Sequence, residues 1–182
     1  MNIIANIKQK MKMIEVKIIQ DIFDEANLRN QEFYNKFGNA GTHRVNKEQR
    51  MTGYLAEACI NQTFNNIQYS DDFNVDFTLD NLTIDSKAQG CNSKPLGYYS
   101  ATLYEEQKTR DTNYYIFSRV KKDFTTAWIC GIISKKKFFK IAKLQPKGTK
   151  TNNFTYDQSR YEVQYKDLGN MHDFLNWHKE NE

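Results

Sequence analysis

Asp76, Asp85 and Lys87 lie close together in residues 75–87, a segment in which apolar and polar residues alternate. Alternation with a period of two predicts β-strands that each have one buried face. A hairpin that turns at residues 80–81 would set Asp76 directly opposite Asp85, with Lys87 two residues farther along the same face. The spacing therefore predicts that two carboxylates and one ammonium group share one small area.

Two carboxylates that face each other across a sheet repel and destabilise it. A divalent cation bound through oxygen ligands would offset the repulsion between Asp76 and Asp85, and Lys87 would offset part of it. The alternative is that both acids are solvated on an open sheet face. For a pair of aspartates taken alone, that alternative is the favoured one.

A glutamate on a preceding helix favours the metal site. Residues 47–64 have helical spacing, and Asn46 with Gln49 forms the pattern of a capping box at the start of this helix. Glu57 lies on a partly apolar stripe, which points toward a sheet more readily than toward water. The other members of the stripe are Gly53, Tyr54, Ile60, Asn61 and Phe64. The alternative is a boundary glutamate paired with a base such as Arg50.

These residues resemble the motif of the PD-(D/E)XK nuclease superfamily. Asp76 is followed nine residues later by Asp85 and then by Lys87, and Glu57 lies on the helix that precedes them. Val75 stands where the motif name has a proline, and an aspartate fills the third position, which accepts Asp or Glu. The resemblance runs from the helix of Glu57 to the C-terminus and is to small phage-type members.

The resemblance implies an α/β or α+β fold with a restriction-endonuclease-like core, in which helices flank a mixed central sheet. It also implies that Glu57, Asp76 and Asp85 bind Mg²⁺ or Mn²⁺ and that Lys87 assists the attacking water. Phosphodiester hydrolysis fits these residues because a bound metal neutralises the ester's charge and lowers the pKa of its water. Gln89 shares the face of Lys87 and is a candidate to orient the water or a phosphate; a polar strand end is an equal alternative.

Basic side chains at two helix starts are candidates to bind the DNA backbone, because helix N-termini and basic side chains both favour phosphate. The candidates are Arg44, Lys47, Arg50, Lys135, Lys136 and Lys137. A solvated charged face is the more frequent role of such clusters. Tyr98, Tyr99 and Tyr104 could stack on bases, but core packing is the favoured assignment, as it is for Trp128 and Trp177.

The remaining elements follow from spacing and composition. Helices are expected at 14–37, at 135–142 and from Met171 onward, and strands at 114–120, 126–133 and, at a sheet edge, 161–165. Residues 98–109 fit a short helix or irregular structure, and residues 145–158 an extended loop. We expect one nuclease-like domain over residues 1–182, divided into an N-terminal helix and loop (1–45), a catalytic core (46–140) and a C-terminal extension (141–182).

Length and composition limit the class of protein. The 182 residues suit one domain, and the 26 lysines and arginines exceed the 22 acidic residues by 4, which permits a nucleic-acid partner without requiring one. Three well-separated cysteines form neither a disulfide framework nor a zinc knuckle. No apolar run is long enough to cross a bilayer and no signal-peptide pattern is present, so we expect a cytoplasmic protein, in the host cytoplasm if it is viral.

The leading hypothesis is a metal-dependent DNA nuclease, with an endonuclease of low sequence specificity favoured. The alternatives are an exonuclease, an enzyme of the Holliday-junction-resolvase type, or a non-catalytic DNA-binding protein of the same fold. An interaction protein whose acids are only surface residues is a further class. The sequence leaves open whether the substrate is single- or double-stranded, and whether the protein is a monomer or a homodimer.

Overall fold

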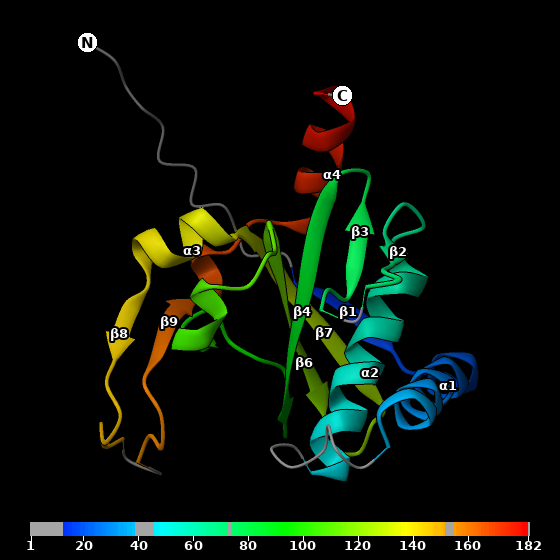
Figure 1. The fold of residues 1–182 in the computed structure, drawn as a ribbon, viewed down its shortest axis with the longest axis horizontal. Coiled ribbons are helices and arrows are strands. Elements are labelled where there is room, and N and C mark those ends of the chain that lie inside the picture. The colour runs from blue at the N-terminus through cyan, green and yellow to red at the C-terminus, as the bar shows by residue number, and fades with distance from the viewer. Residues whose placement is uncertain (1–12, 39–45, 73, 152–154, 182) are drawn as a thin grey trace.

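The computed structural model describes residues 13–38, 46–72, 74–151 and 155–181, which form two β-sheets and four α-helices (Figure 1). The prediction of an α+β fold with a mixed central sheet and flanking helices is confirmed at this level. Arg44 lies outside the described residues. None of the described helices combines the length and the apolar character that crossing a membrane requires.

The larger sheet has six strands, and β4, which carries Asp85 and Lys87, lies between β6 and β3. In spatial order the strands are β1 (Ile14–Lys17), β7 (Thr126–Ser134), β6 (Tyr114–Lys121), β4 (Leu82–Cys91), β3 (Phe77–Leu79) and β2 (Gln68–Tyr69). β4 and β6 pair in parallel, whereas every other pair in this sheet is antiparallel. The expected strands at 114–120 and 126–133 are therefore confirmed as β6 and β7, which are buried on both faces.

A second sheet of three strands lies beside the first (Figure 1). Its order is β5 (Ser100–Tyr104), β9 (Arg160–Gln164) and β8 (Lys143–Gln145), all antiparallel. The strand expected at 161–165 is confirmed as β9, but its expected place at a sheet edge is wrong, because β9 is paired on both sides. The segment 98–109 contains β5 and the 3₁₀ helix η2 (Glu105–Lys108), so it is more regular than its sequence indicated.

The four α-helices are α1 (Gln20–Phe37), α2 (Lys47–Thr63), α3 (Lys135–Ile141) and α4 (Met171–Glu180), and a 3₁₀ turn, η3 (Tyr165–Asp167), precedes α4. The predicted capping box of α2 is confirmed, because the side chains of Asn46 and Gln49 each accept a hydrogen bond from the other's backbone N–H. The Oγ of Ser134 accepts a hydrogen bond from the Lys137 N–H at 3.3 Å and caps α3. Local signals therefore set the helix starts that matter for the site.

The N-terminal helix begins later than its spacing predicted. Residues Ile14–Lys17 form β1, which pairs with the edge of β7, and α1 starts only at Gln20. In β1 the apolar Ile14 and Val16 are half-buried, whereas the charged residues between and after them are exposed. That alternation has the period of a strand, and the open edge of β7 supplies the partner.

Two different layers cover the faces of the central sheet (Figure 1). On one face, α1 and α2 bury residues such as Ile22 and Leu55 against Val120 of β6. On the other face, α3 and the small sheet bury Phe138 and Leu103 against alternate residues of the central strands, Tyr115 and Phe117 among them. Trp128 is buried as predicted, but the core assignment of Trp177 is wrong, because 51% of its surface is exposed.

Candidate active site

The hairpin that carries the aspartates has the predicted register. The pairs are Phe77 with Ile84, Thr78 with Thr83 and Leu79 with Leu82. The turn at 80–81 is confirmed, and Asp80 takes the left-handed conformation with φ of 48°. β3 starts only at Phe77, so Asp76 directly precedes the strand and is not a part of it.

Asp76 nevertheless reaches across to β4. Its Oδ2 accepts a hydrogen bond from the backbone N–H of Ser86 at 2.7 Å, one residue beyond Asp85. The register of the hairpin, continued by one pair, sets Asp76 beside Asp85. The close approach of the two acidic residues is thus a product of strand pairing.

Asp85 is the most deeply buried of the predicted acids, with 2% of its surface exposed. Its Oδ1 accepts a hydrogen bond from the Lys87 Nζ at 2.7 Å. Its Oδ2 is buried and has no hydrogen-bond partner among the described residues, and Nη1 of Arg110 lies 4.0 Å from it. A buried carboxylate oxygen without a donor is costly, so this atom marks a place where a cation is favoured.

The electrostatics of Asp76 point the same way. Burial raises the pKa of Asp76 well above its usual value, and the neighbouring charges of Glu57 and Asp85 raise it further. Lys87 lowers this pKa, and a side-chain hydrogen bond with Asp85 raises it. Like charges held together favour the protonated form of one of them. A divalent cation bound there would reverse that preference, because its charge favours ionised carboxylates.

Glu57 lies on α2 and faces the same group of charges, but an arginine of α1 holds it. Burial raises the pKa of Glu57 to about 7, and Arg29 is the strongest influence that lowers it. Nη2 of Arg29 lies 3.2 Å from Oε2 of Glu57, and Nε donates a hydrogen bond to the same oxygen at 3.3 Å. The guanidinium of Arg29 also stacks on the ring of Tyr69 at 3.7 Å. The basic partner of Glu57 is thus Arg29, which sequence reasoning missed, and Arg50 instead lies over the ring of Tyr34.

The donor chemistry of this group suits a hard cation. No three His, Cys, Asp or Glu side chains in the described ranges converge closely enough to hold a metal ion by themselves. Asp76 and Asp85 offer a pair of carboxylates, and Mg²⁺ is usually bound through one or two carboxylates, waters and substrate phosphates. The two aspartates therefore fit a cation that is shared with a phosphate-containing substrate.

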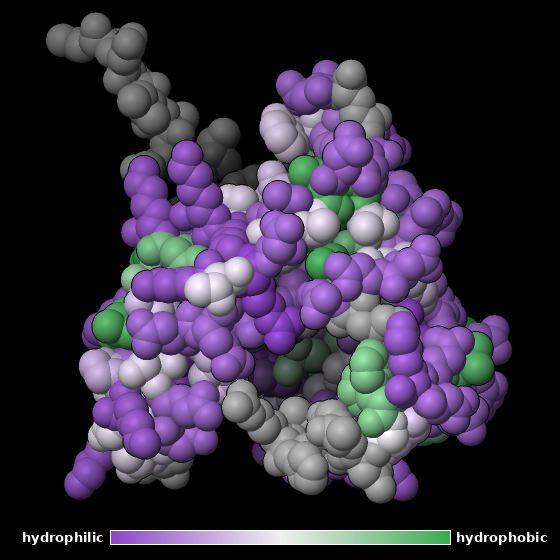
Figure 2. All heavy atoms as spheres, in the orientation of Figure 1, coloured by the Kyte–Doolittle hydropathy of each residue, from purple (hydrophilic) through white to green (hydrophobic). Residues whose placement is uncertain are grey.

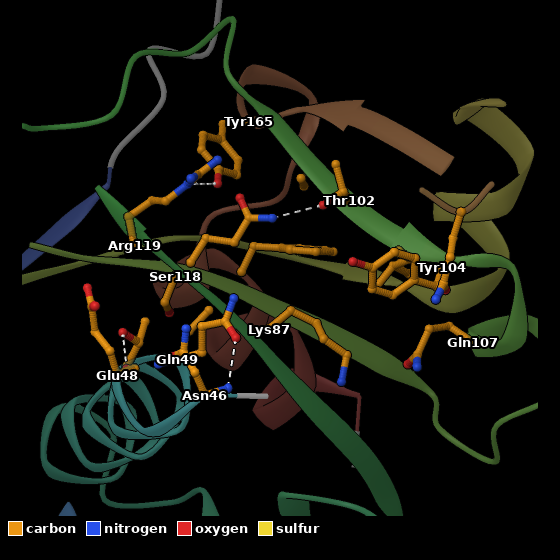
Figure 3. A pocket seen from close by; sticks show the side chains of 18 of the residues that line it. Asn46, Glu48, Gln49, Lys87, Thr102, Tyr104, Gln107, Ser118, Arg119 and Tyr165 are labelled. Carbon is orange, nitrogen blue, oxygen red and sulfur yellow. Dashed lines mark hydrogen bonds between the residues drawn. The ribbon is translucent and has the colours of Figure 1, made fainter. Parts of the chain in front are cut away.

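A polar cleft of about 1020 Å³ begins at Lys87 and extends away from the aspartates. It lies between the start of α2, the second half of β4, the strands β5 and β6, and residues 157–158. Figure 2 shows this face of the molecule hollowed between α2 and the small sheet, and Figure 3 shows the lining side chains. Gln89 lines the cleft, where its Nε2 donates a hydrogen bond to Oγ1 of Thr102 at 3.1 Å.

The predicted nucleic-acid-binding residues lie in separate places. Lys47 is exposed at the start of α2, while Arg50 is turned to α1 by its contact with Tyr34. On α3, Lys136 and Lys137 are exposed, and Lys135 is half-buried and donates a hydrogen bond from Nζ to the carbonyl of Arg110. None of the five side chains that the structure describes therefore joins the aspartate group, and Lys135 alone among them contacts a neighbour of Asp85, Arg110.

The tyrosines behave differently from the favoured assignment. Tyr98 and Tyr104 expose 63% and 42% of their surfaces, so core packing is wrong for both, whereas Tyr99 is half-buried against the core under the small sheet. Of the three, Tyr104 lines the cleft. An exposed aromatic ring on a cleft wall is a suitable surface for stacking.

In comparisons with known proteins, no family model matches this chain and no curated protein matches it in sequence. The resemblance to the PD-(D/E)XK superfamily thus stays a prediction. The case for the candidate site rests on its own geometry and charges.

Proposed function

We propose that the protein is a metal-dependent deoxyribonuclease that uses Mg²⁺ or Mn²⁺. We further propose that it is an endonuclease of low sequence specificity. One observation carries the proposal: Asp85 is 2% exposed, contacts Lys87, and keeps a buried oxygen that no hydrogen-bond donor in the described chain satisfies. A carboxylate with only a structural role is normally paired on both oxygens when it is this deeply buried.

Asp76 and Asp85 would hold the cation, and Glu57 is the third acid whose charge bears on them. When bound, the metal supplies neutralisation of the phosphodiester charge and a water of lowered pKa. Asp76 is fixed for this role by the Ser86 N–H, which orients its carboxylate toward β4. The protein thus supplies two preoriented oxygen ligands at the end of a strand pair.

Lys87 would act on the reacting phosphate. Its Nζ lies 2.7 Å from Asp85, with 28% of its side chain exposed, at the start of the cleft. An ammonium group held at the edge of a metal site can stabilise the charge that develops in the transition state. Gln89, two residues farther along β4, lines the same cleft and is suited to orienting a phosphate or a water.

The order of elements supports a restriction-endonuclease-like core. The helix with Glu57 comes first, the hairpin of β3 and β4 brings Asp76, Asp85 and Lys87, and β6 then pairs in parallel with β4. This is the placement that the resemblance implies for the helix and for the motif strands.

The test is cleavage of four labelled DNA substrates: linear duplex, closed circular duplex, single strand and four-way junction. Each is incubated with Mg²⁺, Mn²⁺ or EDTA, using the wild type, Asp85→Asn and the matched control Asp21→Asn, an exposed aspartate on α1. We expect metal-dependent cleavage that Asp85→Asn loses and Asp21→Asn keeps. Cleavage of the circle identifies an endonuclease, and a lack of cleavage in every combination would contradict the proposal.

A thermal-shift measurement with Mn²⁺ separates the proposed site from a mere surface cluster of acids. We expect Mn²⁺ to raise the melting temperature of the wild type, because a ligand that binds only the folded state stabilises it. The shift should vanish in Asp85→Ala. An equal shift in both proteins would place the ion elsewhere.

A further inference from the structure

The cleft beside Lys87 has a chemistry of its own, distinct from that of the aspartates. Its walls come from α2, β4, β5, η2 and β6, so segments far apart in the sequence meet there (Figure 3). Its volume of about 1020 Å³ is at the upper end of the range of small-molecule pockets, about 300–1,000 Å³. Such a space holds a few nucleotide bases but not the full width of a duplex.

Two buried polar atoms on the cleft walls have no partner. Oγ of Ser118 and Oε1 of Gln107 make no hydrogen bond within the described chain, although these residues are only 2% and 5% exposed. Both residues line the cleft. Buried polar groups are costly unless they are satisfied, so they point to a ligand that offers hydrogen bonds inside the cleft. Hydroxyl and amide groups match the donors and acceptors on the edges of nucleic-acid bases.

Acidic and basic side chains are equally many among the described residues that line the cleft. The acidic residues are Glu48, Glu106 and Asp157, and the basic residues are Lys87, Arg119 and Lys122. A groove that followed a phosphate backbone would carry an excess of positive charge. The balance therefore favours uncharged bases within the cleft and places the phosphates outside it, toward the end where Lys87 meets Asp85.

Tyr104, at the end of β5, supplies an aromatic surface to the lining of the cleft. Tyr104 exposes 42% of its surface, and the guanidinium of Arg160 lies 5.2 Å from the centroid of its ring. Bases of any sequence can stack on an aromatic ring, because every base has a π-face. This tolerance agrees with the low sequence specificity of the proposed nuclease.

We infer that the cleft accepts the unpaired bases of a single-stranded DNA segment whose phosphates run past Lys87 and Asp85. The inference rests on the proposed function, which it deepens by naming the substrate class. Paired bases are stacked and have their hydrogen-bonding edges occupied, so a duplex cannot fill the cleft unless it is opened. The hydrogen-bonding groups of the lining and the exposed Tyr104 both favour bases that are unpaired.

The experiment measures binding in EDTA, where metal-dependent cleavage cannot occur. Fluorescence anisotropy compares a labelled single strand of roughly 12 nucleotides, within the site sizes of single-strand binders, with a blunt duplex of the same sequence. We expect the single strand to bind at least about tenfold more tightly. Tyr104→Ala should weaken single-strand binding about tenfold, the loss expected for one base stack.

Two further variants make the test specific to the cleft. Tyr98→Ala removes an exposed tyrosine that does not line the cleft, and it should bind as the wild type does. Gln107→Leu keeps the side-chain bulk while it removes the unpartnered amide oxygen, and it should weaken single-strand binding several-fold. Thermal melting of each variant confirms that it is folded.

The outcomes separate this inference from the nuclease proposal. Equal affinity for strand and duplex, or wild-type binding by both Tyr104→Ala and Gln107→Leu, would overturn the inference even if the protein cleaves DNA. Tight single-strand binding that depends on both residues, without cleavage in any metal, would support the cleft and refute the nuclease. Loss of cleavage in Asp85→Asn with retained single-strand binding would support both.

Discussion

Two acidic sites at the junction of the helices and the central sheet differ in how they are satisfied. Glu25 of α1 accepts hydrogen bonds from Asn61 and Gln62 of α2 at 3.0 Å each, and from the hydroxyl of Tyr69 of β2 at 2.6 Å. Asp85 of β4 accepts a hydrogen bond from Lys87 on Oδ1, and its Oδ2 has no hydrogen-bond partner among the described residues. Glu25 thus joins α1, α2 and β2, whereas Asp85 keeps one oxygen without a hydrogen bond in the part of the chain that the structure describes.

This difference separates a structural site, that of Glu25, from a chemical site, that of Asp85, whose carboxylate is available to a ligand. Three donors compensate the desolvation of Glu25, so its network stabilises the contact between α1, α2 and β2. Asp85 has another aspartate and a glutamate nearby; burial raises the pKa values of Asp76 and Glu57, and the repulsion among these acids raises them further. An arrangement that costs stability persists when the site uses it, and perturbed carboxylates of this kind gather at functional sites.

The largest effect should come from Asp85→Asn, which breaks the chemical site and leaves the structural one intact. We expect single-turnover cleavage to fall by at least about 1,000-fold, because a principal ligand of the cation is lost. The free energy of unfolding in EDTA should not fall. Glu25→Gln is the matched variant and should cleave at nearly the wild-type rate; comparable loss of cleavage in both would erase the distinction.

The next effect concerns Lys87, which donates a hydrogen bond to Asp85. Lys87→Ala should reduce turnover at saturating DNA by about 100- to 1,000-fold, the range found for loss of one transition-state donor, while Mn²⁺ and DNA still bind. If Lys87 only anchors a phosphate, affinity should fall and turnover at saturation should survive. Single-turnover cleavage near the wild-type rate would show that Lys87 is not catalytic.

The pH dependence of the free energy of unfolding should show how much the buried acid Glu57, next to Asp76 and Asp85, destabilises the folded protein. The pKa of Glu57 is raised from 4.5 to about 7 in the folded protein, mainly by burial. The folded state therefore retains a proton that the unfolded chain releases as the pH rises from about 4.5 to about 7, and stability in EDTA falls through that window. The equivalent free energy is roughly 3 kcal/mol.

Urea unfolding across this pH range measures the effect, with Glu57→Gln as the comparison. The variant lacks the titrating carboxyl, so its stability should fall less steeply than that of the wild type. Asp76, whose pKa is also raised, contributes a fall of the same sign in both proteins. A wild-type stability that rises from about pH 4.5 to about pH 7 by more than that of the variant would contradict the assignment.

Local patterns predicted the parts of the site that depend on near neighbours in sequence. The register that places Asp76 by Asp85 follows from the alternation and the turn at 80–81, and the capping box at Asn46 fixed the start of α2. Both signals act within a few residues, so the sequence contains them completely. The nuclease function itself stays a prediction.

Contacts between distant segments were not predictable in this way. The spacing of Ile14, Ile18 and Ile22 fits a helix, and only the open edge of β7 turns residues 14–17 into a strand. Arg29 reaches Glu57 through the packing of α1 on α2, which no spacing within either helix indicates. Gln107 joins the cleft because β5 pairs with β9, and neither β5 nor that pairing was expected.

The smallest effect is also the sharpest test of the comparison, because the two sites should respond with opposite signs. The Glu25 carboxylate accepts from three donors, whereas the amide of Glu25→Gln has one acceptor oxygen and a donor NH₂ group. The free energy of unfolding should therefore fall by about 1–2 kcal/mol. Asp76→Asn keeps an oxygen for the Ser86 N–H and removes a carboxyl whose ionised form is disfavoured by burial and by Glu57 and Asp85. Stability in EDTA at neutral pH should therefore rise, by up to about 1 kcal/mol. Urea unfolding of both variants and of Glu32→Gln, an exposed glutamate on α1, measures the three changes together. If Asp76→Asn loses stability as Glu25→Gln does, Asp76 and Asp85 stabilise the fold. Repulsion between them would then not destabilise the protein, and a bound cation would not be needed to offset it.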